Sequence, residues 1–517
     1  MTDGYTGAGV WIGFTMMCIG MFMAVLDVQV VATSLTAIQD GLDVPLDRIS
    51  WIQTAYLTAE VIAIPLSGLL TRVLGMRWLF VSAVTCFTLA SIGCAASSTI
   101  AELIGWRVIQ GFSGGMLIPA VFSAVFVLFP PRLEAFATML AGALAVLAPT
   151  VGPVVGGWVT FRFSWHWLFL INVLPGVFTA ALAALTLPRS RVELAGLRRL
   201  DVIALASLAL SLAALQIALK RAPEHGWSSP GVLMLVVTMT VAAALFAARS
   251  LTRAQPIVQL ATLRDSRFAI ACGLSFVLGI GLFGSVYAMP VFLAVVRGHD
   301  SLEIGKVMLV TGVAQLLTAP AAVLLERRVD PRLLATFGFA LFALGLMMST
   351  GESVRSDFDE MFWPQMVRGV AIMFCLLPPT RLALGHLAPE RVPDASGLFN
   401  LMRNLGGAIG IALIDTLLIA RTPIHAAALT EQLQRGDVAT ARWIGIPVNR
   451  LGADPASLDP PMRHLLARLL ERASMTQSLD EAWWMMAAIT ALAVALMGLA
   501  FARSVRRRVP ARTSTSR

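Results

Sequence analysis

The sequence predicts an all-α membrane protein, and three observations support that prediction. Of the 517 residues, 57% are hydrophobic and only 13% are charged, whereas soluble domains carry about 25% charged residues. Apolar runs long enough to cross a bilayer as helices, roughly 20 residues each, recur along the whole chain. An internal repeat links the first and second halves. We therefore expect two pseudo-symmetric six-helix bundles plus two inserted helices.

Fourteen apolar segments are predicted to span the membrane. The first begins near Trp11 with no basic residues before it and no small-residue cleavage site after it, so we expect a retained helix rather than a signal peptide. The predicted spans cover roughly residues 11–33, 50–70, 78–97, 101–124, 135–158, 165–187, 201–219, 230–248, 267–290, 304–324, 333–350, 361–382, 394–420 and 482–503.

These spans divide the chain into four parts. Residues 1–187 form an N-terminal six-helix bundle, and residues 188–266 hold the inserted pair of helices with basic loops. Residues 267–503 form a C-terminal six-helix bundle, and residues 504–517 form a basic cytoplasmic tail. The inserted pair is apolar and nearly free of Gly and Pro, so we expect it to be peripheral and to face lipid.

Residues 421–480 interrupt the C-terminal half with a polar segment that contains Pro447, Pro455, Pro460 and Pro461. We expect this segment to lie outside the membrane, between the last two spans, with a short amphipathic helix at Arg463–Arg472. A lid, an interfacial helix and a docking surface all fit its composition, and the sequence does not choose between them.

Basic residues set the expected orientation. Arg and Lys are concentrated in the loops that share a side with the two termini, so both termini are predicted to be cytoplasmic. The net charge of +9 is therefore explained by topology, and no nucleic-acid partner is expected. The five cysteines all fall in apolar segments without metal-ligand spacing, so no metal site is predicted.

Three ionisable residues lie inside otherwise apolar spans: Asp27, Glu60 and Arg107. A charge in the hydrocarbon core costs at least about 2.5–3.5 kcal/mol, and such residues usually serve as proton relays, ion-pair gates or counter-charges. The three are expected to meet at similar depth in the first half. We predict Asp27 as the main proton or substrate carboxylate, Glu60 as its partner and Arg107 as the modulating cation. A purely structural ion pair is the alternative.

The internal repeat has a second arginine, Arg368, at the position equivalent to Arg107. Arg107 and Pro119 in residues 101–124 have nearly the spacing of Arg368 and Pro379 in residues 361–382. The span that corresponds to the one carrying Asp27 covers residues 267–290 and offers no obvious acid. We therefore expect a structural role for Arg368.

Glycine and proline mark the helices that approach one another closely. Gly111 and Gly115 lie on the same helix face as Arg107, which allows a neighbouring backbone to come near. The next span has a proline- and glycine-rich stretch that predicts a bent, tightly packed helix able to act as a hinge. Its residues are Gly152, Pro153, Gly156 and Gly157.

These stretches resemble the major facilitator superfamily, specifically its fourteen-helix drug:proton antiporter branch of the EmrB/QacA type. Residues 107–115 are similar to the family's R-x-x-Q-G-x-x-x-G motif, and residues 152–157 are similar to its G-P-x-x-G-G antiporter motif. Further similarity to the branch lies in residues 26–35, 165–173 and 399–407.

One family motif is altered. The pattern G-x-x-x-D-R-x-G-R-K corresponds here to Gly68, Arg72, Gly75 and Arg77, and Arg72 stands at the acidic position. The charge relay that this acid makes in relatives is therefore in doubt. The glycines and the basic end remain, so a tight turn is still expected.

Other polar residues in the spans are candidates for substrate contact. Gln53, Tyr56 and Gln110 could line a cavity, although a satisfied helix contact explains them equally well. Asp415 is expected either to bind a substrate cation or to lie near the headgroups. Arg403 is expected to stabilise the gate on the cytoplasmic side.

The resemblance implies a proton-coupled exporter of hydrophobic or amphipathic compounds, of the multidrug-efflux type that confers antibiotic resistance, in the bacterial inner membrane. It implies alternating access driven by the proton gradient, without a cofactor. Gram-negative members of the branch often work with a periplasmic adaptor protein and an outer-membrane channel, so such partners are implied beside lipid, protons and substrate.

Two alternatives to multidrug efflux place different requirements on the sequence. Export or flipping of an endogenous lipid or lipid precursor fits the same fold. A membrane enzyme would need clustered His, Asp and Glu ligands or an activated nucleophile at a membrane face. The sequence offers neither, so no enzyme activity is predicted.

Overall fold

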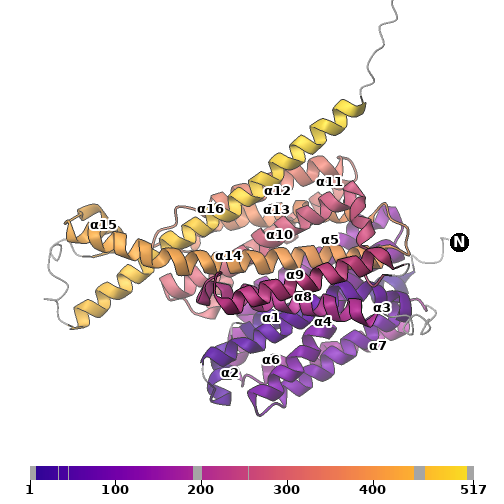
Figure 1. Cartoon of the computed structure of the whole chain (residues 1–517), viewed down its shortest axis with the longest axis horizontal. Coiled ribbons are helices and arrows are strands. Elements are labelled where there is room, and N and C mark those ends of the chain that lie inside the picture. The colour runs from indigo at the N-terminus through magenta and orange to yellow at the C-terminus, as the bar shows by residue number, and fades with distance from the viewer. Residues whose placement is uncertain are drawn as a thin grey trace, which may run out of the picture.

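The computed structural model describes residues 7–32, 34–44, 46–189, 201–253, 256–446 and 460–508, and this part of the chain is helical without strands (Figure 1). The predicted tail beyond residue 508 and the basic loop 190–200 lie outside the described residues. Helix α1 begins at one end of the bundle, here called the N-terminal end. Helix α15 lies beyond the opposite end, here called the hairpin end (Figure 1).

The first half and the inserted pair contain nine α-helices within the described residues. They are α1 (Ala8–Ala32), α2 (Leu35–Leu42), α3 (Leu46–Ala95), α4 (Ile100–Leu128), α5 (Pro131–Arg162), α6 (Trp167–Leu170), α7 (Val173–Thr186), α8 (Val202–His225) and α9 (Pro230–Thr252). Helix α3 joins two predicted spans, because its backbone leaves helical geometry only at Gly75, where φ is 75°. The two spans therefore appear as one broken helix with the break at the expected tight turn.

The second half follows the 3-10 turn η2 (Leu260–Arg264). It consists of α10 (Ser266–Val291) with the π-helical turn η3 (Phe292–Arg297), α11 (Ser301–Glu326), α12 (Pro331–Met347), α13 (Phe358–Leu384), α14 (Val392–Gln434), α15 (Val438–Ile444) and α16 (Pro460–Arg508). In the described part of the chain, 12 helices are long and apolar enough to cross a membrane. Helix α3 counts once among them although it holds two predicted spans, and the shorter α12 corresponds to another, so each predicted span has a helix.

The inserted helices differ from each other in their surroundings. Helix α9 exposes large apolar side chains such as Met234 (69%) and Val241 (63%), as a lipid-facing helix should. Helix α8 instead contributes Leu208 and Leu212 to an apolar cluster that also contains Phe399 of α14. Helix α8 also exposes apolar side chains, Val202 (68%) and Leu210 (53%) among them. Both inserted helices are therefore peripheral, as expected, and α8 in addition covers a seam between the two halves.

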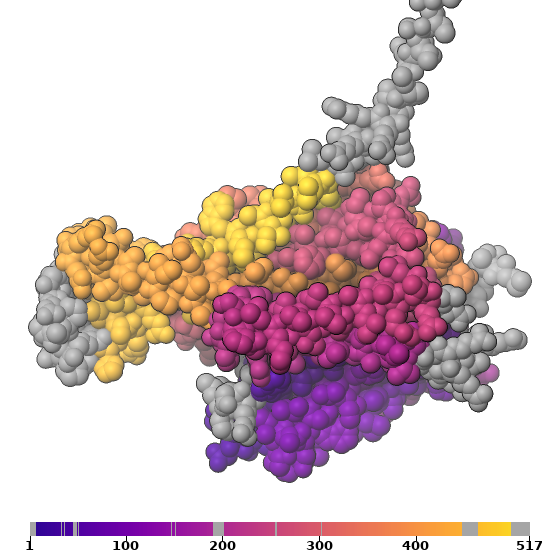
Figure 2. All heavy atoms as spheres, in the orientation of Figure 1, coloured from indigo at the N-terminus to yellow at the C-terminus, as the bar shows by residue number. Residues whose placement is uncertain are grey.

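Where the structure describes the polar segment 421–480, at residues 421–446 and 460–480, the chain is mostly helical rather than loop-like. Helix α14 continues to Gln434 and α16 starts at Pro460, so the two helices project past the bundle with α15 between them (Figures 1 and 2). The predicted short helix at Arg463–Arg472 is wrong as a separate element. It belongs to the 49-residue α16, because no Gly or Pro interrupts the sequence from Met462 until Gly498. We call residues 421–446 and 460–481 the hairpin.

Candidate functional site

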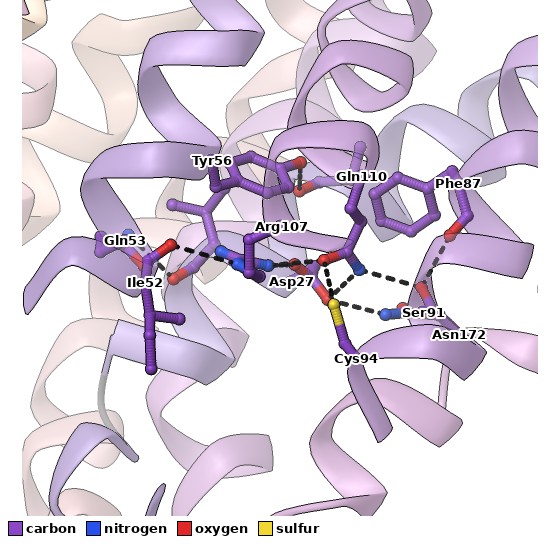
Figure 3. A network of polar contacts seen from close by, with 12 residues as sticks. Asp27, Ile52, Gln53, Tyr56, Phe87, Ser91, Cys94, Arg107, Gln110 and Asn172 are labelled. Atoms are coloured by element: carbon purple, nitrogen blue, oxygen red, sulfur yellow. Dashed lines mark hydrogen bonds and ion pairs between the residues drawn. The ribbon is translucent and has the colours of Figure 1, made fainter. Parts of the chain in front are cut away.

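The side chain of Asp27 lies fully buried in the first half, on α1. Its carboxylate forms an ion pair with Arg107 of α4, whose side chain is also fully buried. It accepts further hydrogen bonds from Asn172 Nδ2 at 2.8 Å and from Gln110 Nε2 at 3.0 Å (Figure 3). The side chains of Arg107, Gln110 and Asn172 therefore hold one carboxylate. Such partners are needed because a buried charge is costly unless it is paired and hydrogen-bonded.

Arg107 occupies a nearly complete cage. Its Nη1 donates to Gln110 Oε1 at 2.8 Å, and its Nε donates to the Ile52 carbonyl at 3.4 Å. The guanidinium carbon lies 4.1 Å from the centre of the Tyr56 ring, a cation–π distance. Its Nη2 is buried without a hydrogen-bond partner among the described residues. The guanidinium therefore has one nitrogen whose N–H groups are free for another acceptor.

Two glycines bring α4 close enough to α3 for this cage to form. A Cβ on Gly111 would collide with the Tyr56 carbonyl, and one on Gly115 would collide with the Glu60 carbonyl. Helix α4 itself begins at a capped end, where the Thr99 hydroxyl accepts from the Glu102 backbone N–H at 3.3 Å. The predicted role of Gly111 and Gly115 in close helix contact is thus visible in the structure.

Gln110 extends the site toward α3. Its Nε2 donates to Ser91 Oγ at 2.9 Å, and the Ser91 hydroxyl donates to the Phe87 carbonyl at 2.9 Å. The Cys94 thiol donates to Gln110 Oε1 at 3.6 Å. No role in this site was predicted for Ser91, Cys94 or Asn172. Asn172 was detectable as an uncharged polar residue at the start of an apolar span.

Glu60 is buried on the same helix as Tyr56, with 8% of its surface exposed. No ion pair or hydrogen bond joins Glu60 to Asp27 in the described part of the chain. The charges of Arg107 and Asp27 nevertheless both act on the buried Glu60 carboxyl. The three predicted charges therefore lie in one neighbourhood, with direct contact only between Asp27 and Arg107. The position of Glu60 along its predicted helix indicates its depth in the membrane, but the sequence does not show which way its side chain points.

The four residues expected to contact substrate divide into separate environments. Tyr56 and Gln110 are completely buried and belong to the Asp27 site. Gln53 donates to the Val28 carbonyl at 3.3 Å. Asp415 lies in the second half, where Tyr287 Oη donates to it at 2.5 Å. These side chains do not converge on one surface in the conformation described.

The altered motif after the second predicted span forms a contact between the halves. Arg72 of α3 is ion-paired with Asp394 of α14, whose side chain is 2% exposed. A Cβ on Gly68 would collide with that same aspartate. Arg77 Nη1 donates to the Leu187 carbonyl at 3.4 Å. Arg72, at the position where the family motif has an acid, is thus paired with an acid of the other half.

Further contacts join the halves near the N-terminal end. Ser396 Oγ donates to the Pro119 carbonyl at 2.9 Å. Arg403, 7% exposed, places its guanidinium carbon 5.5 Å from the Phe122 ring centre and 5.4 Å from that of Phe399. Arg403 therefore lies between the halves, and its role in a gate stays a prediction.

The proline- and glycine-rich stretch of α5 lies against α1. A Cβ on Gly152 would collide with the Gln29 side chain of α1. Pro153, Gly156 and Gly157 follow within the same unbroken helix, which runs from Pro131 to Arg162.

In the part of the chain that the structure describes, no group of three or more His, Cys, Asp or Glu side chains could hold a metal ion.

Comparisons with known proteins agree with this architecture. A family model described as Major Facilitator Superfamily matches residues 17–411. The colistin resistance protein EmrB of Acinetobacter baumannii is 36% identical over 448 residues, which cover 85% of this chain and 88% of that protein. The multidrug export protein EmrB of Escherichia coli K12 is 33% identical over 417 residues, covering 80% and 81%. The solved structure of the proton:xylose symporter XylE has a TM-score of 0.57 at 12% identity, over 95% of this chain and 96% of that chain.

Proposed function

We propose that the protein is a multidrug efflux transporter driven by proton entry. The chain belongs to the major facilitator superfamily and matches EmrB multidrug exporters over most of its length. Its substrates would be hydrophobic or amphipathic compounds. The observation that supports the proposal most strongly is the fully buried pair of Asp27 and Arg107. A transporter has a use for an acid at this depth, where charge is costly.

The chemistry of the pair supports proton coupling. An ionised Asp27 is neutralised by Arg107, so the pair can stay in a dry environment. A proton on Asp27 would remove the negative partner and leave the guanidinium with Tyr56, Gln110 and the Ile52 carbonyl. Protonation would therefore weaken the link between α1 and α4, which is how proton binding can bias a conformational equilibrium.

The contacts between the halves supply the element that must move. Arg72–Asp394 and Ser396–Pro119 hold α3 and α4 against α14 near the N-terminal end. Alternating access requires these contacts to break while contacts at the hairpin end form. A proton that moves through 100 mV releases about 2.3 kcal/mol, which is comparable to the net contribution of about two hydrogen bonds.

Substrate contact is proposed for side chains of both halves. Gln53 and Asp415 are not fully buried, and Asp415 presents an acid suited to a lipophilic cation. Glu60 is a second acid in the first half and remains a candidate for proton transfer once the helices move. Tyr56 and Gln110 would act through Arg107, because their side chains are enclosed in the present conformation.

The cellular setting is proposed from the family. We place the protein in the bacterial inner membrane with both termini in the cytoplasm, so the hairpin would project into the periplasm. A periplasmic adaptor and an outer-membrane channel are proposed partners, and the hairpin is the surface that reaches farthest toward them (Figure 2). No cofactor is proposed, because the proton gradient supplies the energy.

Transport by reconstituted protein tests the proposal. Proteoliposomes would carry wild type, Asp27→Asn or the matched control Asp43→Asn, which changes an exposed acid in a left-handed backbone position that asparagine tolerates. Wild type and Asp43→Asn should move ethidium against its gradient when a pH gradient is imposed, and Asp27→Asn should not. Equal ethidium transport by all three would contradict the proposal, and movement of a fluorescent phospholipid instead of ethidium would favour a lipid exporter.

A further inference from the structure

A second buried guanidinium lies in the C-terminal half. Arg368 of α13 is the repeat partner of Arg107 and is 2% exposed. Its guanidinium carbon lies 4.8 Å from the centre of the Trp483 ring of α16. Its Nε and Nη1 are buried without hydrogen-bond partners in the described part of the chain. The aromatic ring offers a cation–π contact but no acceptor, so this cation is incompletely satisfied.

A buried acid accompanies it. Glu352 lies in the loop between α12 and α13, and both of its carboxyl oxygens are buried without a hydrogen bond of normal geometry among the described residues. The loop is held in place by α16, because the Asp480 carboxylate accepts from the backbone N–H groups of Gly351 at 3.0 Å and Glu352 at 3.3 Å. The Glu352 backbone is thus fixed while its side chain remains unsatisfied.

The charged neighbours of Glu352 come from two helices. Arg368 on α13 and Asp480 on α16 act on its carboxyl, and Trp483 adds an indole N–H. The other charged groups at this end have partners of their own or are exposed. Arg297 and His299 contact Asp357, Arg421 and His425 contact Glu481, and Arg355 and Asp359 face outward.

These surroundings favour the neutral acid. Burial raises the pKa of Glu352 from 4.5 to about 8, Arg368 opposes that rise, Asp480 adds to it, and the Trp483 indole lowers it. An ionised carboxylate without hydrogen bonds or a contacting cation would cost several kcal/mol in this environment. The neutral carboxyl avoids that cost, and the fixed backbone of the loop keeps it beside Arg368.

We propose that Glu352 is a second proton-binding site, separate from Asp27, and that loss of its proton transfers Arg368 from the Trp483 ring to the Glu352 carboxylate. The reaction is a proton dissociation followed by ion-pair formation, with the proton going to water at the hairpin end. Gly351 and Arg355, on either side, are exposed and give water a route to the loop. The site binds protons whether or not Asp27 couples transport.

The pH dependence of stability tests proton binding directly. Between pH 4.5 and about 8, the folded protein holds a proton on Glu352 that the unfolded chain has released. Raising the pH across this window therefore favours unfolding. Thermal unfolding of the full-length protein in detergent should show a Tm that falls with pH in this window. The fall should be smaller in Glu352→Gln and unchanged in Asp359→Asn, an exposed acid nearby.

A second measurement follows the carboxyl itself, so the proposal stays testable if Glu352→Gln folds poorly. Infrared difference spectra should show a protonated-carboxyl band that disappears with a midpoint near pH 8. Arg368→Met should move that midpoint to higher pH, because the opposing cation is gone. A wild-type slope of Tm in Glu352→Gln, or a carboxyl midpoint indifferent to Arg368→Met, would overturn the proposal.

Discussion

Arg107 and Arg368 occupy equivalent places in the two halves but have different environments. Arg107 is ion-paired with Asp27 and hydrogen-bonded to Gln110. Arg368 is ion-paired with no acid within the described residues and rests on Trp483. The comparison shows that a repeated arginine need not have a repeated role. What distinguishes the two sites is the element that supplies the acid, a helix in one half and a loop in the other.

The largest expected difference is in stability. Arg107→Gln leaves Asp27 buried without its cation and should cost about 3–5 kcal/mol in the free energy of unfolding. Arg368→Gln removes a buried cation that lacks an ion pair, so its cost should be far smaller. Denaturant unfolding in detergent measures both variants. Adding Asp27→Asn to Arg107→Gln should recover much of the loss, and equal costs for the two single arginine variants would erase the contrast.

Transport should separate the two acids next. Asp27→Asn is expected to reduce pH-driven ethidium transport to the level of protein-free liposomes. The reason is that an asparagine beside Arg107 cannot bind and release a proton. Glu352→Gln is expected to keep transport while altering its dependence on pH at the hairpin end. The measurement is initial transport rate against pH on each side of the membrane. The reverse pattern would exchange the roles assigned to the two halves.

Much of the fold and part of the Asp27 site could be predicted from the sequence. Hydropathy predicted the spans, and the cost of buried charge identified Asp27 and Arg107. The pairing of Arg72 with Asp394, 322 residues apart in the chain, could not be predicted because it depends on how the halves meet. Glu352 was missed because the acid for Arg368 was sought in the matching span rather than in the loop before it. The helical hairpin was missed because its prolines were read as signs of a loop.

Helix contact gives a third, intermediate effect. Gly111→Ala would place a Cβ against the Tyr56 backbone carbonyl, which cannot move aside without separating α3 from α4. The expected cost is about 1–3 kcal/mol, with weaker ethidium transport because Arg107 would lose its cage. Gly273→Ala on α10, where a Cβ would meet no atom within 4 Å, is the matched control. Similar losses of stability in both variants would mean that close approach at α4 is not required.

Two single hydroxyl groups complete the comparison, and the smallest effect of all is expected at Tyr56. Tyr56→Phe keeps the ring beside Arg107 and loses only the hydrogen bond to the Ala24 carbonyl at 3.1 Å, so about 1 kcal/mol is expected. Tyr287→Phe removes a 2.5 Å hydrogen bond to Asp415. With an ionised Asp415 that loss should be larger, about 1.5–3 kcal/mol. Unfolding free energies measured at the same pH give the ranking, and a larger loss in Tyr56→Phe would reverse it.

Proton release on substrate binding is the most direct test of the pair formed by Asp27 and Arg107. Detergent-solubilised protein in weakly buffered solution would receive tetraphenylphosphonium, and a pH indicator would count the protons released per molecule bound. Wild type should release protons. Asp27→Asn should bind the cation but release one proton fewer per bound molecule, because the proton that Asp27 carries is missing. Undiminished release from Asp27→Asn would contradict the account, because the proton would then come from another group.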